Sequence, residues 1–144
     1  MVFGIFGESC VGKSTLAVAL RAALDAEVFT GKDYLRLAKN EVDARKLFRK
    51  KLEDAVTGSH VIYVIAEKEH LQLLPEKAVR ILMTADLELI LERFAARMHG
   101  NLPEPVKMML EKKHGCFDNE VRTFLVHNGI GVEDICTRIL EGRF

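Results

Sequence analysis

Eight residues near the start of the chain have the glycine spacing of a phosphate-binding loop. They match the pattern G-x-x-x-x-G-K-[ST] at every fixed position and read Gly7-Glu8-Ser9-Cys10-Val11-Gly12-Lys13-Ser14. The two glycines let the backbone curl closely enough for several N–H groups to point at one phosphate. The lysine can reach the outer phosphates of a nucleoside triphosphate, and the Ser14 hydroxyl can bind the bridging Mg²⁺. Residues 7–15, ending at Thr15 on the first helical turn, are therefore predicted to bind ATP and Mg²⁺.

The segments on either side of this loop agree with that prediction. The apolar run Val2–Phe6 indicates a strand covered on both faces. From Lys13 to Leu24 the leucines and alanines recur at helical spacing, so strand, loop and helix follow in order. A simple glycine-rich turn before a helix is the alternative. Within the loop, Cys10 is either a small filler or a thiol activated by the helix N-terminus.

The rest of the chain alternates between short apolar runs and helical patterns. Strands are predicted at residues 28–30, 61–65, 79–83 and 121–126. Helical patterns cover residues 35–56, as one or two helices, and residues 87–98, 105–114 and 132–140, with Asp86 at an expected N-cap. This alternation predicts an α/β protein, a three-layer α/β/α sandwich around a mostly parallel five-stranded sheet. Residues 1–144 are expected to form a single domain.

Composition and charge limit the partners and the compartment. Lys plus Arg and Asp plus Glu each total 21, so the net charge is zero and a nucleic-acid partner is not expected. The odd number of three widely spaced cysteines favours a reducing cytoplasm. The N-terminal apolar run is too short for a membrane span and lacks a basic leader, so no membrane association is expected. The sequence does not predict the oligomeric state.

The phosphate loop and the order of the elements resemble the small P-loop kinases, the group containing nucleoside monophosphate kinases, shikimate kinase and gluconate kinase. This resemblance covers most of the chain, and the loop is its most specific part. It implies that Asp33, in Gly31-Lys32-Asp33 after the second strand, orients or deprotonates an acceptor hydroxyl or holds a magnesium-bound water. As a residue before an apolar-periodic segment, Asp33 is equally a candidate helix N-cap. Arg36 is a further candidate for binding an anionic acceptor.

Glu67 follows the predicted strand 61–65 at the edge of the sheet where P-loop proteins often keep an acid associated with Mg²⁺. Because Lys68 and Glu69 follow it, a polar turn is the alternative. The resemblance also implies that residues 98–115 form a short lid. Asn128, just after the last strand, falls where these kinases place the loop that contacts adenine, mainly through its backbone.

Arg93 and Arg97 resemble the arginine pair at the start of the lid of these kinases. Their spacing of four places both on one face of a helix, and no acid lies three or four positions from either. Two unpaired cations suit a transferring phosphate, although a salt bridge to a distant acid is the alternative.

These features predict a phosphotransferase that moves the γ-phosphate of Mg²⁺-ATP to an unidentified small acceptor of nucleotide, nucleoside or sugar-acid type. Lys13, Asp33, Arg93 and Arg97 are its predicted catalytic residues. A non-catalytic ATP sensor and a stand-alone ATPase are the alternatives. The chain has no Asn-Lys-x-Asp signature, which argues against a Ras-like GTPase, and no CxxC set that would support a zinc-bearing lid.

Overall fold

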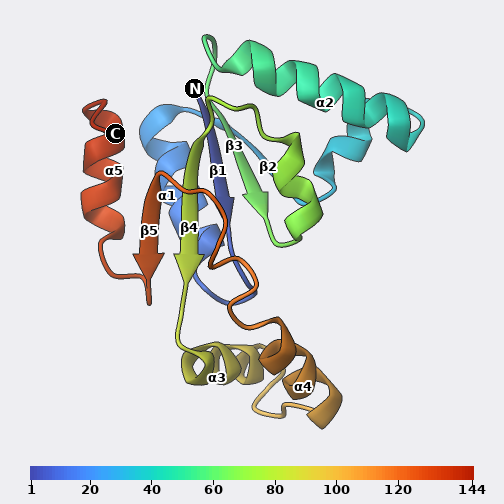
Figure 1. Ribbon diagram of the computed structural model, residues 1–144, viewed down its shortest axis with the longest axis vertical. Helices are drawn as coiled ribbons and strands as arrows, with labels where there is room; N and C mark the ends of the chain where they lie inside the picture. Colours follow the sequence, from blue (N-terminus) through green and yellow to red (C-terminus); the bar gives the residue numbers. More distant parts are fainter.

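The computed structural model describes residues 1–144, which form three layers, with a parallel sheet between two layers of helices (Figure 1). The strands lie in the order β2-β3-β1-β4-β5, and every pair is parallel. Their bounds are Val2–Phe6 for β1, Glu27–Thr30 for β2, Val61–Ile65 for β3, Val79–Thr84 for β4 and Phe124–His127 for β5. Helices α1 (Lys13–Leu24) and α5 (Val132–Leu140) cover one face, and α2 (Glu41–Ala55) covers the other. The predicted α/β/α sandwich is confirmed.

The central strands β1 and β3 are buried along their whole length because helices cover both faces. Along β1, Phe3 and Ile5 pack into the core beneath α1 and α5, whereas Val2 and Phe6 pack into the core beneath α2. Two apolar cores therefore hold β1 from opposite sides. This fixes the position of Phe6, the residue from which the chain turns into the predicted phosphate loop.

A pair of helices, α3 (Leu87–Arg97) and α4 (Glu104–Lys113), lies beyond the carboxyl ends of the strands (Figure 1). The two helices contact each other, and Ile90 and Leu110 join the core on the α1 side. The predicted lid segment 98–115 corresponds to the turn between these helices and to α4. None of the chain's helices combines the length and the apolar character needed to cross a membrane.

Two elements differ from the sequence prediction, and one alternative is decided. The segment 35–56, expected to form one or two helices, contains two, a 3-10 helix, η1 (Asp33–Leu37), and α2, because the Asn40 side chain accepts the Asp43 amide and starts a new helix. A second 3-10 helix, η2 (Lys68–Leu73), was not predicted. The last strand begins at Phe124 rather than at 121, since the register of β5 on β4 puts Val121 opposite Ala78, before β4 starts.

Candidate functional site

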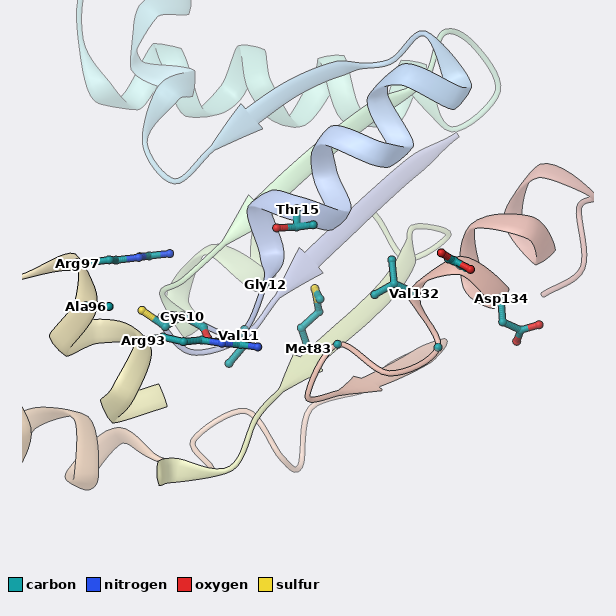
Figure 2. A pocket seen from close by; sticks show the side chains of 13 residues that line it. Cys10, Val11, Gly12, Thr15, Met83, Arg93, Ala96, Arg97, Val132 and Asp134 are labelled. Carbon is teal, nitrogen blue, oxygen red and sulfur yellow. The ribbon is translucent and has the colours of Figure 1, made fainter. Parts of the chain in front are cut away.

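The phosphate-loop sequence forms the turn from β1 into α1 (Figure 2). Gly7 has φ 156°, and a Cβ there would collide with the Met83 carbonyl oxygen. Gly12, at the N-cap of α1, has φ 98°, a conformation that favours glycine. The two fixed glycines of the motif are therefore required by the backbone path.

The amides of this turn have no acceptors within the protein. The Gly7 N–H still donates to Ile65, but no N–H from Glu8 to Thr15 donates to a backbone or side-chain group. Regular pairing resumes at Leu16, whose N–H donates to Gly12. Consecutive free amides at a helix N-terminus form a concave anion site, strengthened by the positive end of the helix dipole.

The Lys13 ammonium is turned back onto this loop and donates to the carbonyl oxygens of Gly7, at 2.8 Å, and of Glu8. Burial lowers the pKa of Lys13 to about 8. The nearby Arg97 cation acts in the same direction, whereas Cys10 and the Glu8 carboxylate act against it. Lys13 is therefore a partly desolvated cation that an anion in the loop would stabilise.

Both predicted lid arginines extend from α3 toward the phosphate loop (Figure 2). Arg93 Nη1 donates to the Cys10 carbonyl oxygen at 2.9 Å, and Arg97 lines the cavities on both sides of the loop. Neither forms an ion pair with a carboxylate, so the salt-bridge alternative is wrong. The structure thus brings Lys13, Arg93 and Arg97 together around the free amides.

A cavity of about 960 Å³ lies between the phosphate loop, α3 and the start of α5 (Figure 2). Arg93 and Arg97 stand at one end of it and Asp134 at the other (Figure 2), and Glu133 is also a lining residue. The remaining lining residues are small or mostly apolar and comprise Cys10, Val11, Gly12, Thr15, Met83, Ala96, Gly129, Gly131 and Val132. The cavity is therefore cationic at one end and acidic at the other.

A smaller cavity of about 270 Å³ lies on the other side of the loop, against the carboxyl ends of β2 and β3. Its walls include Lys13, Ser14, Thr30 and Ala66. Asp33 lies beside it, because its Oδ2 accepts the Thr30 amide at 2.9 Å. The N-cap of η1 is Lys32 and that of α2 is Asn40, so the interpretation of Asp33 as a helix cap is wrong.

The predicted magnesium ligands are separated. Ser14 lines the smaller cavity, but Glu67 is exposed at the start of η2 and does not line it. The wall residue directly after β3 is Ala66, and no group of three or more His, Cys, Asp or Glu side chains could hold a metal ion. Mg²⁺ in phosphate sites is usually bound through one or two carboxylates, the substrate phosphates and water. No carboxylate lines the smaller cavity, so the residues present would hold the ion only through the Ser14 hydroxyl, together with the substrate phosphates and water.

Asn128, the predicted adenine-loop residue, uses its side chain to hold the start of α3. Its Oδ1 accepts the Asp86 amide and its Nδ2 donates to Asp86 Oδ2, both at 2.9 Å. His127 Nε2 contacts Asp86 Oδ1 at 3.0 Å, and hydrogen bonds from Asn128 and then His127 lower the pKa of Asp86. Asp86 is at the N-cap as predicted, but its carboxylate makes no capping bond. Gly129, rather than Asn128, lines the larger cavity.

Two charged residues have partners that the sequence did not reveal. Arg36 lies 3.7 Å from Glu27 and 4.3 Å above the Phe29 ring, which accounts for it without an acceptor. Glu8, inside the phosphate loop, directs its carboxylate to the end of α4, where it contacts His114 and Gly115. No local pattern could have indicated either arrangement.

No protein-family model matches this chain, and no curated protein matches it by sequence. Solved structures do match it along nearly its whole length. A shikimate kinase from Acinetobacter baumannii in complex with shikimate has a TM-score of 0.64 at 16% identity, covering 99% of this chain and 94% of that one. A gluconokinase from Sinorhizobium meliloti has a TM-score of 0.60 at 15% identity, covering 99% and 90%. The chain has the fold of the small P-loop kinases. A shikimate kinase from Aquifex aeolicus, at 20% identity and a TM-score of 0.57 over 99% and 95% of the two chains, agrees.

The lowered pKa of Lys13 predicts that stability rises with pH in the nucleotide-free protein. Between pH values of about 8 and 10.5, Lys13 is protonated in the unfolded chain but largely neutral in the folded protein. The unfolded state therefore binds more protons in this range, and the free energy of unfolding increases as the pH rises. Below about 8 the cost of the buried charge is fully present, on the order of 3 kcal/mol. Lys13→Met should therefore be more stable than the wild type near neutral pH.

The difference between the two proteins should shrink toward alkaline pH. Urea unfolding of both proteins at about pH 7 and about pH 9.5 measures it, and all other titrating groups cancel in the comparison. A difference in the free energy of unfolding that stays constant over this range would contradict the lowered pKa of Lys13.

Proposed function

We propose that this chain is an ATP-dependent phosphotransferase that moves the γ-phosphate of Mg²⁺-ATP to a small acceptor of nucleotide, nucleoside or sugar-acid type. The observation that carries this proposal is the run of amides from Glu8 to Thr15 without protein acceptors. Unpaired backbone donors are rare in folded proteins, and here they are surrounded by three cations. A polyphosphate provides the acceptor oxygens and the negative charge that this arrangement lacks.

The larger cavity supports a nucleoside triphosphate as that anion. Its cationic end, at Arg93 and Arg97, adjoins the phosphate loop, and its walls between the two ends include Val11, Met83 and Val132. A nucleotide has the same sequence of properties, from phosphates to an apolar base face to a base edge with hydrogen-bond donors. In the proposed complex the base lies toward Glu133 and the loop 129–131.

The phosphoryl transfer is assigned to residues on both sides of the loop. Lys13 would exchange its contacts with two carbonyl oxygens for the outer phosphates, and Arg97 would stabilise charge on the transferring group. Mg²⁺, when bound at Ser14 and the phosphates, would neutralise further negative charge. Asp33 would orient or deprotonate an acceptor hydroxyl in the smaller cavity, at the sheet edge where ligands of α/β proteins collect.

Further expectations belong to this proposal. Residues 1–144 act as one domain, with residues 98–115, the turn after α3 and α4, as the lid-like segment. The three cysteines are all unpaired thiols, which supports the cytoplasm as the compartment. A non-catalytic ATP sensor is the second candidate function, favoured by Ala66 at the position where an acid associated with Mg²⁺ is common.

The central test is binding and acceptor-dependent turnover of Mg²⁺-ATP. ATP should raise the melting temperature, because a ligand that binds only the folded state stabilises it. Lys13→Ala removes charge-assisted contacts worth roughly 1.5–3 kcal/mol, so calorimetry should show affinity weakened about ten- to hundredfold. ADP release in a panel of acceptors, compared with a no-acceptor reaction, identifies a kinase. Equal affinity of the wild type and Lys13→Ala for ATP would refute the binding mode.

Arg93→Ala and Arg97→Ala should reduce turnover more than they weaken ATP binding, because both arginines face the position of the transferring phosphate. A loss on the order of a hundredfold or more in turnover is expected for Arg97, which has no protein partner. Arg21→Ala, on the exposed side of α1 and without an ion pair, is the matched control. Lost stability with intact turnover would make the arginines structural and favour the ATP sensor.

Asp33→Asn separates a role toward the acceptor from a role toward ATP. Asparagine keeps an oxygen for the Thr30 amide, so folding and ATP affinity should be preserved. Loss of the carboxylate should lower acceptor-stimulated turnover by about a hundredfold. Stopped reactions that follow phosphorylated acceptor, together with calorimetry of ATP, measure the two effects; equal losses in both would contradict the assignment.

A further inference from the structure

The α3–α4 pair contacts the phosphate loop at two points close together in the chain. From α3, Arg93 donates to the Cys10 carbonyl oxygen at 2.9 Å. At the end of α4, the Glu8 carboxylate receives the Gly115 amide on Oε2 and contacts His114 Nδ1 with Oε1, both at 3.1 Å. The loop predicted to bind phosphate is thus also the surface on which the two helices rest.

The contact between Glu8 and the end of α4 is buried and geometrically well defined. The Glu8 side chain is only 9% exposed, although it belongs to the loop at the carboxyl end of strand β1. Both carboxylate oxygens have a partner, and one partner is a backbone N–H that cannot rotate away. Gly115 has φ 80°, and a Cβ there would lie 3.1 Å from Asp118 Oδ2, so the chain turns sharply at this point.

A carboxylate in an anion-binding loop needs a reason. Facing the phosphates, Glu8 would repel them; facing α4, it leaves the loop amides free and accepts the N–H of Gly115, two residues past the end of the helix. The Glu8 backbone carbonyl meanwhile accepts from Lys13. One residue therefore joins the end of α4 to the lysine that the proposed function assigns to the phosphates.

We propose that Glu8 is a positioning residue: it holds the end of α4 against the phosphate loop and so sets where Arg93 and Arg97 lie over the phosphates. Its effect on catalysis rests on the proposed function, whereas its effect on the helices does not. If Glu8 instead acts directly on a bound nucleotide, its negative charge would matter and its two hydrogen bonds would not.

Glu8→Ala and Glu8→Gln separate these two roles. Alanine removes both contacts. Glutamine keeps an oxygen for the Gly115 amide and an NH₂ group that can donate to His114 Nδ1, but it removes the charge. Glu111→Ala and Glu111→Gln are matched controls, because Glu111 is exposed one turn before His114 and its side chain has no hydrogen bond or ion pair. His114→Ala removes one contact only and should give an intermediate result.

The first measurement is amide hydrogen exchange of the nucleotide-free protein. Exchange in residues 104–118 should become about tenfold or more faster in Glu8→Ala, while Glu8→Gln and both Glu111 variants should match the wild type. Exchange in β1 and β3 reports whether the variant is folded. If Glu8→Ala is unfolded, the comparison of His114→Ala with the Glu111 variants decides. Exchange in 104–118 that matches the Glu111 variants would overturn the proposal.

The second measurement is ATP affinity and acceptor-stimulated turnover. Glu8→Ala should reduce turnover by at least about tenfold with a smaller change in ATP affinity, and Glu8→Gln should restore it, since the hydrogen bonds are kept. Equal tightening of ATP binding in both variants would show that charge is the relevant property and would overturn the positioning role. A protein that fails to bind ATP at all refutes the proposed function, while the exchange experiment still tests the anchor.

Discussion

The rest of the site depends on one turn, from the end of β1 into α1, which leaves its amides free. β1 is held between β3 and β4 and packed on both faces, so the chain must leave the sheet at a fixed place. Met83 of the neighbouring strand crowds Gly7, and the left-handed Gly12 starts the helix. On this path the amides from Glu8 to Thr15 donate to no group of the protein. The rigid sheet thus maintains a site that would be satisfied by an anion.

Positive charge around this turn is maintained at a cost to stability. Lys13 is largely buried, and Arg97 lies close enough to disfavour its charged form further. Arg93 donates to the Cys10 carbonyl oxygen, and the Arg97 side chain has no hydrogen-bond partner in the protein. Concentrating cations that form no ion pair destabilises the empty protein, and a bound polyphosphate reverses that effect. This pattern is typical of a binding site rather than of a structural salt-bridge network.

The α3–α4 pair is joined to both loops that border the larger cavity. At the start of α3, Asp86 is held by His127 at the end of β5 and by Asn128 in the turn after it. At the end of α4, Glu8 of the phosphate loop holds Gly115. Movement of the helices would therefore change contacts with both loops. Because the two anchors are hydrogen bonds and not large apolar interfaces, they can be exchanged for other partners at modest free-energy cost.

The sequence by itself determined the phosphate loop, the order of strands and helices and hence the sheet, because glycine requirements and apolar periodicity are local properties of the chain. It could not determine which side chains meet. Glu8 and His114 are 106 positions apart, Arg93 and Cys10 are 83 apart, and Asp86 and Asn128 are 42 apart. For the same reason the sequence could not show that Glu67 lies outside the smaller cavity or that Arg36 pairs with Glu27. Such pairings were decided by the tertiary structure, since only the packing of helices onto both faces of the sheet brings these distant segments within hydrogen-bonding distance.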